Sequence, residues 1–153
     1  MTDDRLNRGF ASAAKYCAFT ERAPKQVFDK LISWDFSEEQ SKKIILRLIE
    51  ENFLNEERFA RAFCNDKFEF NRWGKVKIKM ELGKFNLSYE VLTLALESIN
   101  PEKYQKVIAE LTNKKWQNLV GKGDDYLQKR KAANYMMQKG FEGELVWKEL
   151  NKL

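Results

Sequence analysis

Apolar residues recur at helical spacing along most of this chain, and turn-forming residues separate one such stretch from the next. The most regular stretch begins at Ser37, because a serine followed three residues later by Gln40 forms a capping box at a helix start. Two shorter helices are predicted before it, over residues 10–20 and from Pro24 to about Trp34. The apolar stripe of the helix that follows Ser37 consists of Ile44, Ile45, Leu48, Ile49 and Phe53.

Each predicted start of a later helix has a residue whose side chain can accept a hydrogen bond from a free backbone N–H group. These residues are Asn55, Ser88, Asn100 and Asp124. The helix that starts at Asp124 should end at Gly140, because glycine readily adopts the left-handed conformation of a helix end. Its apolar pattern consists of Tyr126, Ala133, Met136 and Met137, and a last helix should carry Leu145, Val146, Trp147 and Leu150.

One stretch fits two structures on local pattern alone. Residues 76–82 alternate apolar and charged side chains, which is typical of a half-buried strand. A helix fits as well, because it would place Gly74, Ile78, Leu82 and Phe85 on one face. The segment before it, residues 71–74, should form a bend that uses the conformational freedom of Gly74.

A repeat at a spacing of about 50 residues favours the helix. Three segments join one helical stripe to the next: Leu31-x4-Phe36-Ser37, Leu82-x4-Leu87-Ser88 and Met136-x4-Phe141-Glu142. Each follows a further helix, so residues 74–85 take a position that is helical in the other copies. The sequence therefore predicts an all-α fold of three tandem three-helix repeats, at residues 1–53, 54–100 and 101–153, in an elongated, curved array.

Composition narrows the classes of function. The 153 residues are 43% hydrophobic and 33% charged, which favours a soluble, helix-rich protein. The chain contains no His, the commonest general base and a frequent zinc ligand, so we expect no catalytic residues, metal or cofactor. Without a membrane-length apolar run or a signal-peptide pattern, a cytoplasmic protein is expected. Cys17 and Cys64 are isolated and are expected to be buried free thiols.

The net charge of +5 is unevenly spread. Acidic residues dominate residues 37–57, whereas basic residues outnumber acidic ones in the rest of the middle and last repeats. This distribution suggests a polyanion or an acidic protein surface as the partner. For any single basic residue, a solvated position is the alternative. The candidate contacts are Lys67, Arg72, Lys75, Lys77, Lys79, Lys84, Lys129, Arg130 and Lys131.

Trp73 is the one aromatic residue that is a candidate for contact with a partner. Beside Arg72 and Gly74, it could stack on a nucleic-acid base or insert into a partner surface. A tryptophan that plugs the junction between two helices is the alternative, and it is the one we expect.

Several short motifs occur in a fixed order over roughly residues 10 to 150. In the middle these are Leu54-Asn55-Glu56, Arg58-Phe59-Ala60, Lys67 and Gly74-x3-Ile78-x2-Glu81-Leu82. The flanking motifs are Arg22-x4-Val27-x3-Leu31 and Lys131-Ala132-x7-Gly140-Phe141. Their order and spacing together resemble the RecX family, bacterial modulators of the RecA recombinase.

The chain departs from that family at a few positions. Asp35, Asn52 and Asn86 lie in turns where the family often has glycine, and these residue types tolerate a left-handed backbone. Lys67 stands where the family usually has arginine, so bidentate recognition of a carboxylate or phosphate is lost there.

The resemblance implies a non-enzymatic regulator that lies in the groove of a RecA filament on single-stranded DNA and contacts neighbouring subunits. Such a protein would lower ATP hydrolysis, strand exchange and filament growth, and we expect it to be a monomer without membrane contact. The leading alternative is an autonomous helical DNA-binding protein that acts without RecA. A helical adaptor for an unrelated protein is the third hypothesis.

Overall fold

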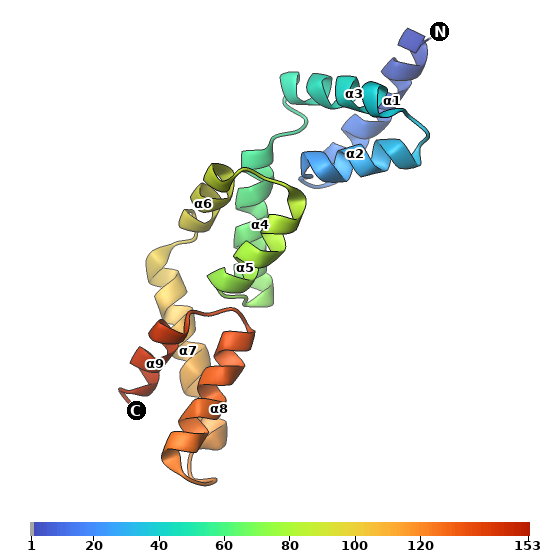
Figure 1. Cartoon of the computed structure of the whole chain (residues 1–153). Helices are drawn as coiled ribbons and strands as arrows, with labels where there is room; N and C mark the ends of the chain where they lie inside the picture. Colours follow the sequence, from blue (N-terminus) through green and yellow to red (C-terminus); the bar gives the residue numbers. More distant parts are fainter. Residues whose placement is uncertain (1) are drawn as a thin grey trace.

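The computed structural model describes residues 2–153, and all the regular elements in this range are helical (Figure 1). Within these described residues, nine α-helices form three groups of three, which follow one another along an elongated, curved array. In Figure 1 the second helix of each group lies along one side of the array, and the third helix lies along the other. The predicted all-α array of three-helix repeats is therefore confirmed.

The first group consists of α1 (Thr2–Phe19), α2 (Pro24–Ser33) and α3 (Glu38–Glu50). The side chain of Ser37 accepts a hydrogen bond of 3.1 Å from the N–H of Gln40, as the capping box predicts. The prediction placed the start of α1 too late, at residue 10. The first turns of α1 have few apolar residues, but one of them, Leu6, packs against the core of the first group. Phe53, expected on the α3 stripe, lies beyond the end of the helix.

The second group consists of α4 (Glu56–Asn71), α5 (Lys75–Leu82) with a 3-10 turn (Gly83–Phe85), and α6 (Tyr89–Glu97). The stretch that fitted both a strand and a helix is thus helical. On α5 the buried residues are Ile78 and Leu82, one helical turn apart.

The third group consists of α7 (Pro101–Leu119), α8 (Asp125–Gln138) and α9 (Gly143–Leu150). The apolar pattern predicted for α8 is partly wrong, because Tyr126 and Met137 are 62% and 48% exposed. The ring of Tyr126 instead stacks on Trp147 of α9, with 6.1 Å between the ring centroids. The stripe that α8 buries consists of Gln128, Ala132, Ala133 and Met136.

Left-handed residues end the second helix of each group and connect it to the third. Their φ angles are 67° for Asp35, 57° for Asn86 and 97° for Gly140. Asn52, after α3, is also left-handed. The prediction that Asp and Asn adopt a left-handed backbone in these turns is therefore confirmed. In the bend of residues 71–74, however, Arg72 adopts the left-handed conformation, and Gly74 has an ordinary φ of −80°.

The buried residues form two cores. The first group has its own core, which includes Leu31 and Leu48. The second and third groups share one continuous core, in which Ile78 and Met136 are fully buried, and Ala23 from the start of α2 also packs into it. Cys17 and Cys64 are buried free thiols, as expected.

The joint between the second and third groups is hydrogen-bonded. The first N–H groups of a helix have no partner within that helix. In α5 the N–H of Gly74 donates to the carbonyl of Lys139 (2.8 Å), and the N–H of Val76 donates to that of Gly140 (2.9 Å). The turn between α8 and α9 therefore caps the start of α5 from the neighbouring group.

The joint between the first and second groups is more open. Ala23, at the start of α2, donates its N–H to the side chain of Gln26 in its own helix (2.8 Å). Clefts of about 300 and 230 Å³ open between the two groups, and Phe85 lines both of them. Across the joint, Arg58 forms a salt bridge with Glu21 at 2.6 Å.

Candidate functional site

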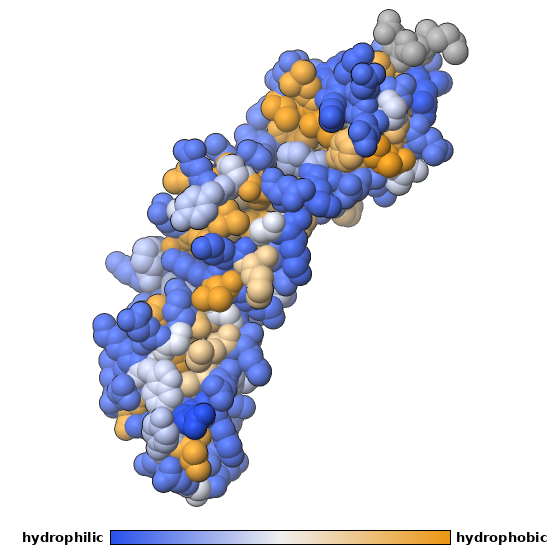
Figure 2. Space-filling model, in the orientation of Figure 1, coloured by the Kyte–Doolittle hydropathy of each residue, from blue (hydrophilic) through white to orange (hydrophobic). Residues whose placement is uncertain are grey.

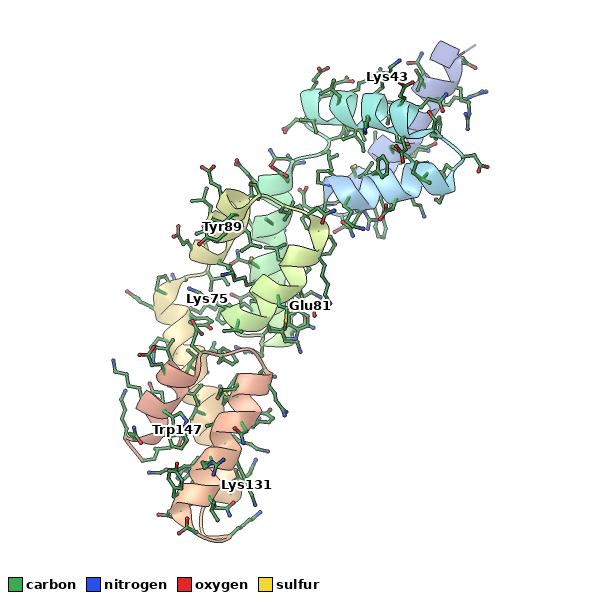
Figure 3. The ribbon with its side chains drawn as sticks, in the orientation of Figure 1. Lys43, Lys75, Glu81, Tyr89, Lys131 and Trp147 are labelled. Atoms are coloured by element: carbon green, nitrogen blue, oxygen red, sulfur yellow. The ribbon has the colours of Figure 1, made fainter. Side chains whose placement is uncertain are left out.

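The predicted basic residues of α5 divide between two edges of the helix. Lys75 lies with its ammonium 4.8 Å from the ring centre of Tyr104 in α7, and Lys79 lies 6.0 Å from that of Tyr89 in α6. Lys77 lies on the other edge, where its ammonium is 4.5 Å from the ring centre of Trp73. In Figure 3, Lys75 lies on the side of α5 toward α6 and α7, and Glu81 lies on the opposite side.

Lys67 and Lys77 converge on Trp73. Their ammonium nitrogens lie 5.0 Å and 4.5 Å from the centre of its ring, although one comes from α4 and the other from α5. Trp73 is half-buried and packs against the shared core, so the expected role at the helix junction is confirmed. Both lysines are therefore held against the same ring by cation–π contacts.

The other predicted residues are not part of this cluster. Lys84 forms a salt bridge of 2.9 Å with Glu81, and Arg72 lies exposed at the left-handed end of α4. On α8, Lys129 lies 5.8 Å from the ring centre of Trp116, while Arg130 and Lys131 are exposed.

The sequence prediction missed a second cluster, in the third group. The ring of Tyr135 in α8 has the ammonium of Lys115 at 4.5 Å and that of Lys139 at 5.9 Å from its centre. Lys115 belongs to α7, so two segments again contribute the cations. The signal that could have found it is the repeat, because Lys67 and Lys115 each precede the last buried residue of their helix.

The first group contains a third cluster of this kind. The guanidinium of Arg22 lies 3.8 Å from the ring centre of Tyr16, and the ammonium of Lys30 lies 5.4 Å from it. We call these three sets the aromatic–cation clusters: Tyr16 with Arg22 and Lys30, Trp73 with Lys67 and Lys77, and Tyr135 with Lys115 and Lys139.

None of the six cations of the aromatic–cation clusters forms a salt bridge with a described side chain. Seven salt bridges connect described side chains, and all of them use other cations. Opposite charges within about 4 Å would screen such cations, and without them the six can meet an external anion. One donor is already used, because Nε of Arg22 donates to the carbonyl of Tyr16 at 3.1 Å. The clusters can therefore bind an anionic group.

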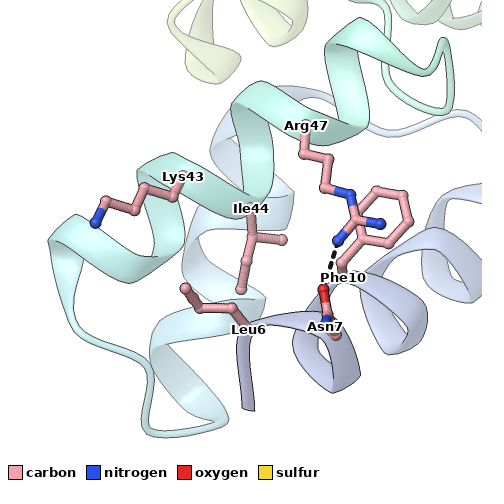
Figure 4. A pocket seen from close by; sticks show the side chains of 6 residues that line it. All are labelled: Leu6, Asn7, Phe10, Lys43, Ile44 and Arg47. Carbon is pink, nitrogen blue, oxygen red and sulfur yellow. Dashed lines mark hydrogen bonds between the residues drawn. The ribbon is translucent and has the colours of Figure 1, made fainter. Parts of the chain in front are cut away.

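A cleft of about 350 Å³ lies between α1 and α3 in the first group (Figure 4). Leu6, Phe10 and Ile44 supply apolar walls, and Lys43 and Arg47 supply charge. The guanidinium of Arg47 is already engaged, because it stacks on Phe10 at 3.9 Å and donates to Oδ1 of Asn7 at 2.9 Å. Its salt bridge with Glu51 reduces the charge further.

The visible surface does not present one large apolar docking face. Figure 2 shows hydrophilic side chains over most of this side of the array, with separate apolar patches on each group. In the part of the chain that the structure describes, no three His, Cys, Asp or Glu side chains are placed to hold a metal ion. No described helix is long and apolar enough to cross a membrane.

Tyr104 is a buried residue whose surroundings raise the pKa of its hydroxyl. Burial raises the pKa of its hydroxyl far above the ordinary value, and the hydrogen bond that it donates to Glu142 adds to this. The same oxygen accepts a hydrogen bond of 2.9 Å from the N–H of Lys75. Tyr104 therefore stays neutral and serves as a structural link between α5, α7 and α9.

Family models match two of the three helical groups. Residues 55–96 match the model described as RecX, second three-helix domain, and residues 102–150 match RecX, third three-helix domain. Together the two matched segments cover more than half of the chain.

Curated relatives extend the similarity over nearly the whole chain. Regulatory protein RecX of Oceanobacillus iheyensis is 28% identical over 145 residues, which are 94% of this chain and 52% of that protein. Regulatory protein RecX of Clostridium perfringens strain 13 is 30% identical over 143 residues, 93% of this chain and 66% of the relative. The chain thus spans about half the length of the first and about two thirds of the second.

Two solved structures share the fold. The crystal structure of RecX from Lactobacillus salivarius superimposes with a TM-score of 0.89 at 22% identity, covering 99% of this chain and 97% of that one. A crystal structure of regulatory protein RecX gives a TM-score of 0.85 at 17% identity, covering 99% and 74%. These similarities support the arrangement of the three helical groups.

Proposed function

The chain belongs to the RecX family of regulatory proteins, and on this premise we propose that it is a non-enzymatic regulator of RecA filaments on single-stranded DNA. It binds in the filament groove, contacts neighbouring RecA subunits, and lowers ATP hydrolysis, strand exchange and filament growth. The repeated helical groups suit this role because an elongated, curved array can contact a polymer over a long distance.

The observation that carries the proposal is the set of cations without counter-charges. Six of them gather in the aromatic–cation clusters, and each helical group contributes one cluster. A filament on DNA presents phosphates and acidic side chains along its length, and such a surface attracts repeated cations. Because this attraction is electrostatic, added salt should weaken it.

The proposal is tested by the DNA-dependent ATPase of RecA. We expect the protein to lower the hydrolysis rate at well below one monomer per RecA subunit, because one bound array affects several subunits. Strand exchange should fall in the same concentration range. An unchanged ATPase rate and unchanged strand exchange at saturating protein would contradict the proposal.

Two charge-reversed double variants test whether inhibition depends on contacts at particular positions or only on the net charge of the protein. Lys77→Glu with Lys131→Glu changes corresponding positions of α5 and α8, and should weaken inhibition. Lys106→Glu with Lys148→Glu makes the same charge change at exposed positions of α7 and α9, and should inhibit like the unmodified protein. Equal weakening in both would indicate that net charge alone is responsible.

The second candidate function is DNA binding without RecA. The same unneutralised cations favour it, because they can contact phosphates directly. Its test is salt-sensitive binding to single-stranded DNA alone, with charge reversal at Lys75, Lys77 and Lys79 lowering the affinity. An unaffected affinity in that variant would argue against it.

A further inference from the structure

We infer that the three aromatic–cation clusters are equivalent subsites that bind one single strand of nucleic acid along the array. The inference goes beyond the proposed function by assigning the contacts to six cations and three rings. It depends on the proposed function only in that a recombinase filament supplies such a strand.

The clusters occupy the same place in each group, between the first and second helices. On the first helix the position directly before the last buried residue is held by Tyr16, Lys67 and Lys115. On the second helix, Lys30 and Tyr135 directly precede Leu31 and Met136. The first group therefore takes its ring from the first helix and a cation from the second, and the third group reverses this arrangement.

The middle group forms its aromatic–cation cluster from residues at other positions. Glu81 occupies the position that corresponds to Lys30, and its charge is engaged by Lys84 at 2.9 Å. The ring comes instead from Trp73, in the loop between α4 and α5. Three different residue combinations thus place a ring with two cations at this position of every group.

The placement of the charges suggests an external anion. Two cations from separate segments lie within 6 Å of one ring in every cluster. The two cations of a cluster contact the same ring and repel each other, and no described carboxylate forms a salt bridge with any of the six. A phosphate bound between the two cations would remove the repulsion.

The rings favour a single strand over other anionic partners. Tyr135 is 39% exposed, and Tyr16 and Trp73 are half-buried with one part accessible. Bases of a single strand can stack on such rings, whereas a duplex keeps its bases paired inside. A single strand also repeats its phosphates and bases along its length, as the clusters repeat along the array.

The test compares two double variants of the second helical group, each of which loses two positive charges. Lys67→Gln with Lys77→Gln removes both cations of the Trp73 cluster, whereas Lys75→Gln with Lys79→Gln removes two cations from the other edge of α5. Binding of fluorescent oligothymidylate is measured by anisotropy over a range of salt concentrations. All positions are at least partly exposed, and circular dichroism checks that both variants fold.

We expect the cluster variant to lower the slope of log affinity against log salt by about 0.7, because the two cations of a cluster hold one phosphate and each single-strand phosphate contact contributes about 0.7. The edge variant should change the slope by less than half of that. Lys115→Gln with Lys139→Gln should reproduce the effect of the Trp73 cluster variant. A long oligonucleotide should bind more tightly than a short one, because it reaches more than one cluster.

Three outcomes would overturn the inference. The first is an equal loss in the cluster and edge variants, which would indicate a diffuse basic surface. The second is an unmodified protein that does not bind oligothymidylate in a salt-dependent way. The third is a cluster variant that loses binding to RecA without DNA but keeps binding to the oligonucleotide, which would make an acidic protein surface the ligand. Inhibition of RecA ATPase is measured separately, so the proposed function can stand when this inference fails.

Discussion

The backbone of Gly74 lies directly against the backbone of Gly140. A Cβ atom on Gly74 would lie 2.3 Å from the carbonyl carbon of Gly140, and one on Gly140 would lie 2.3 Å from the Cβ of Lys77. Only glycine permits such an approach, and the two hydrogen bonds from the start of α5 depend on it. At the equivalent position of the first group stands Ala23, whose N–H bonds within its own helix.

Gly74→Ala should therefore disrupt the joint between the second and third groups. The added methyl group meets backbone, which cannot move aside as a flexible side chain can, so the two groups must separate and lose hydrogen bonds. We expect the free energy of unfolding to fall by about 2 to 4 kcal/mol, the range for overpacking plus lost buried hydrogen bonds. Urea denaturation measures it.

Gly83→Ala is the matched control for this variant. A Cβ on Gly83 would meet no atom within 4 Å, and its φ of −60° suits any residue. The substitution should leave the protein as stable or stabilise it by up to about 1 kcal/mol. If Gly74→Ala and Gly83→Ala have the same free energy of unfolding, the close approach of the Gly74 and Gly140 backbones does not contribute to the stability of the joint.

Tyr104→Phe should weaken the same joint from the side of α7. The change removes a hydroxyl that donates to Glu142 and accepts from the N–H of Lys75, and leaves both partners without it. The expected loss is about 1 to 3 kcal/mol. Thermal unfolding compares it with Tyr89→Phe, where the ring is 74% exposed. Equal melting temperatures in the two variants would contradict the structural role of Tyr104.

Stability should fall at alkaline pH because of buried acids. Burial raises the pKa of the Cys64 thiol to about 12, from an ordinary value of 9.0, and raises that of Tyr104. Since the folded pKa is the higher one, the stabilisation is complete below pH 9 and is lost as the pH rises toward 12.

Each such group lowers the free energy of unfolding by up to about 1.4 kcal/mol per pH unit in that interval. Denaturation at pH 8, 9 and 10 measures the slope. Cys64→Ala should make the dependence shallower, although a small cavity lowers its stability at every pH. An identical slope in the variant would rule out the thiol as a contributor.

The helical pattern predicted most of the fold because burial repeats along each helix and side chains mark the ends. The start of α1 was missed, since Leu6 is one of few apolar residues in its first turns. The stripe of α8 was misplaced because Gln128 is buried while Tyr126 is exposed, the reverse of their hydropathy. Hydropathy does not reveal a neighbouring ring such as Trp147.

The candidate site was predicted only in part. The sequence grouped Lys75, Lys77 and Lys79 together, but a helix directs alternate residues to different edges, and only Lys77 meets Trp73. The cluster at Tyr135 joins residues from α7 and α8 that are far apart in the sequence. Their contact depends on how the two helices pack, and only the repeat offered a hint of it.

The two separate cores predict that the first group unfolds independently. Leu48 is fully buried in the core of the first group, and Ile78 is fully buried in the core shared by the other two. Leu48→Ala should lower the free energy of unfolding by about 2 to 5 kcal/mol, and so should Ile78→Ala.

Because few contacts cross the open joint at Ala23, each loss should stay within its own core. Hydrogen exchange should then show faster exchange in α1 to α3 for Leu48→Ala, with unchanged exchange in α4 to α9, and the converse for Ile78→Ala. Faster exchange throughout the array in both variants would mean that the three groups unfold as one cooperative unit.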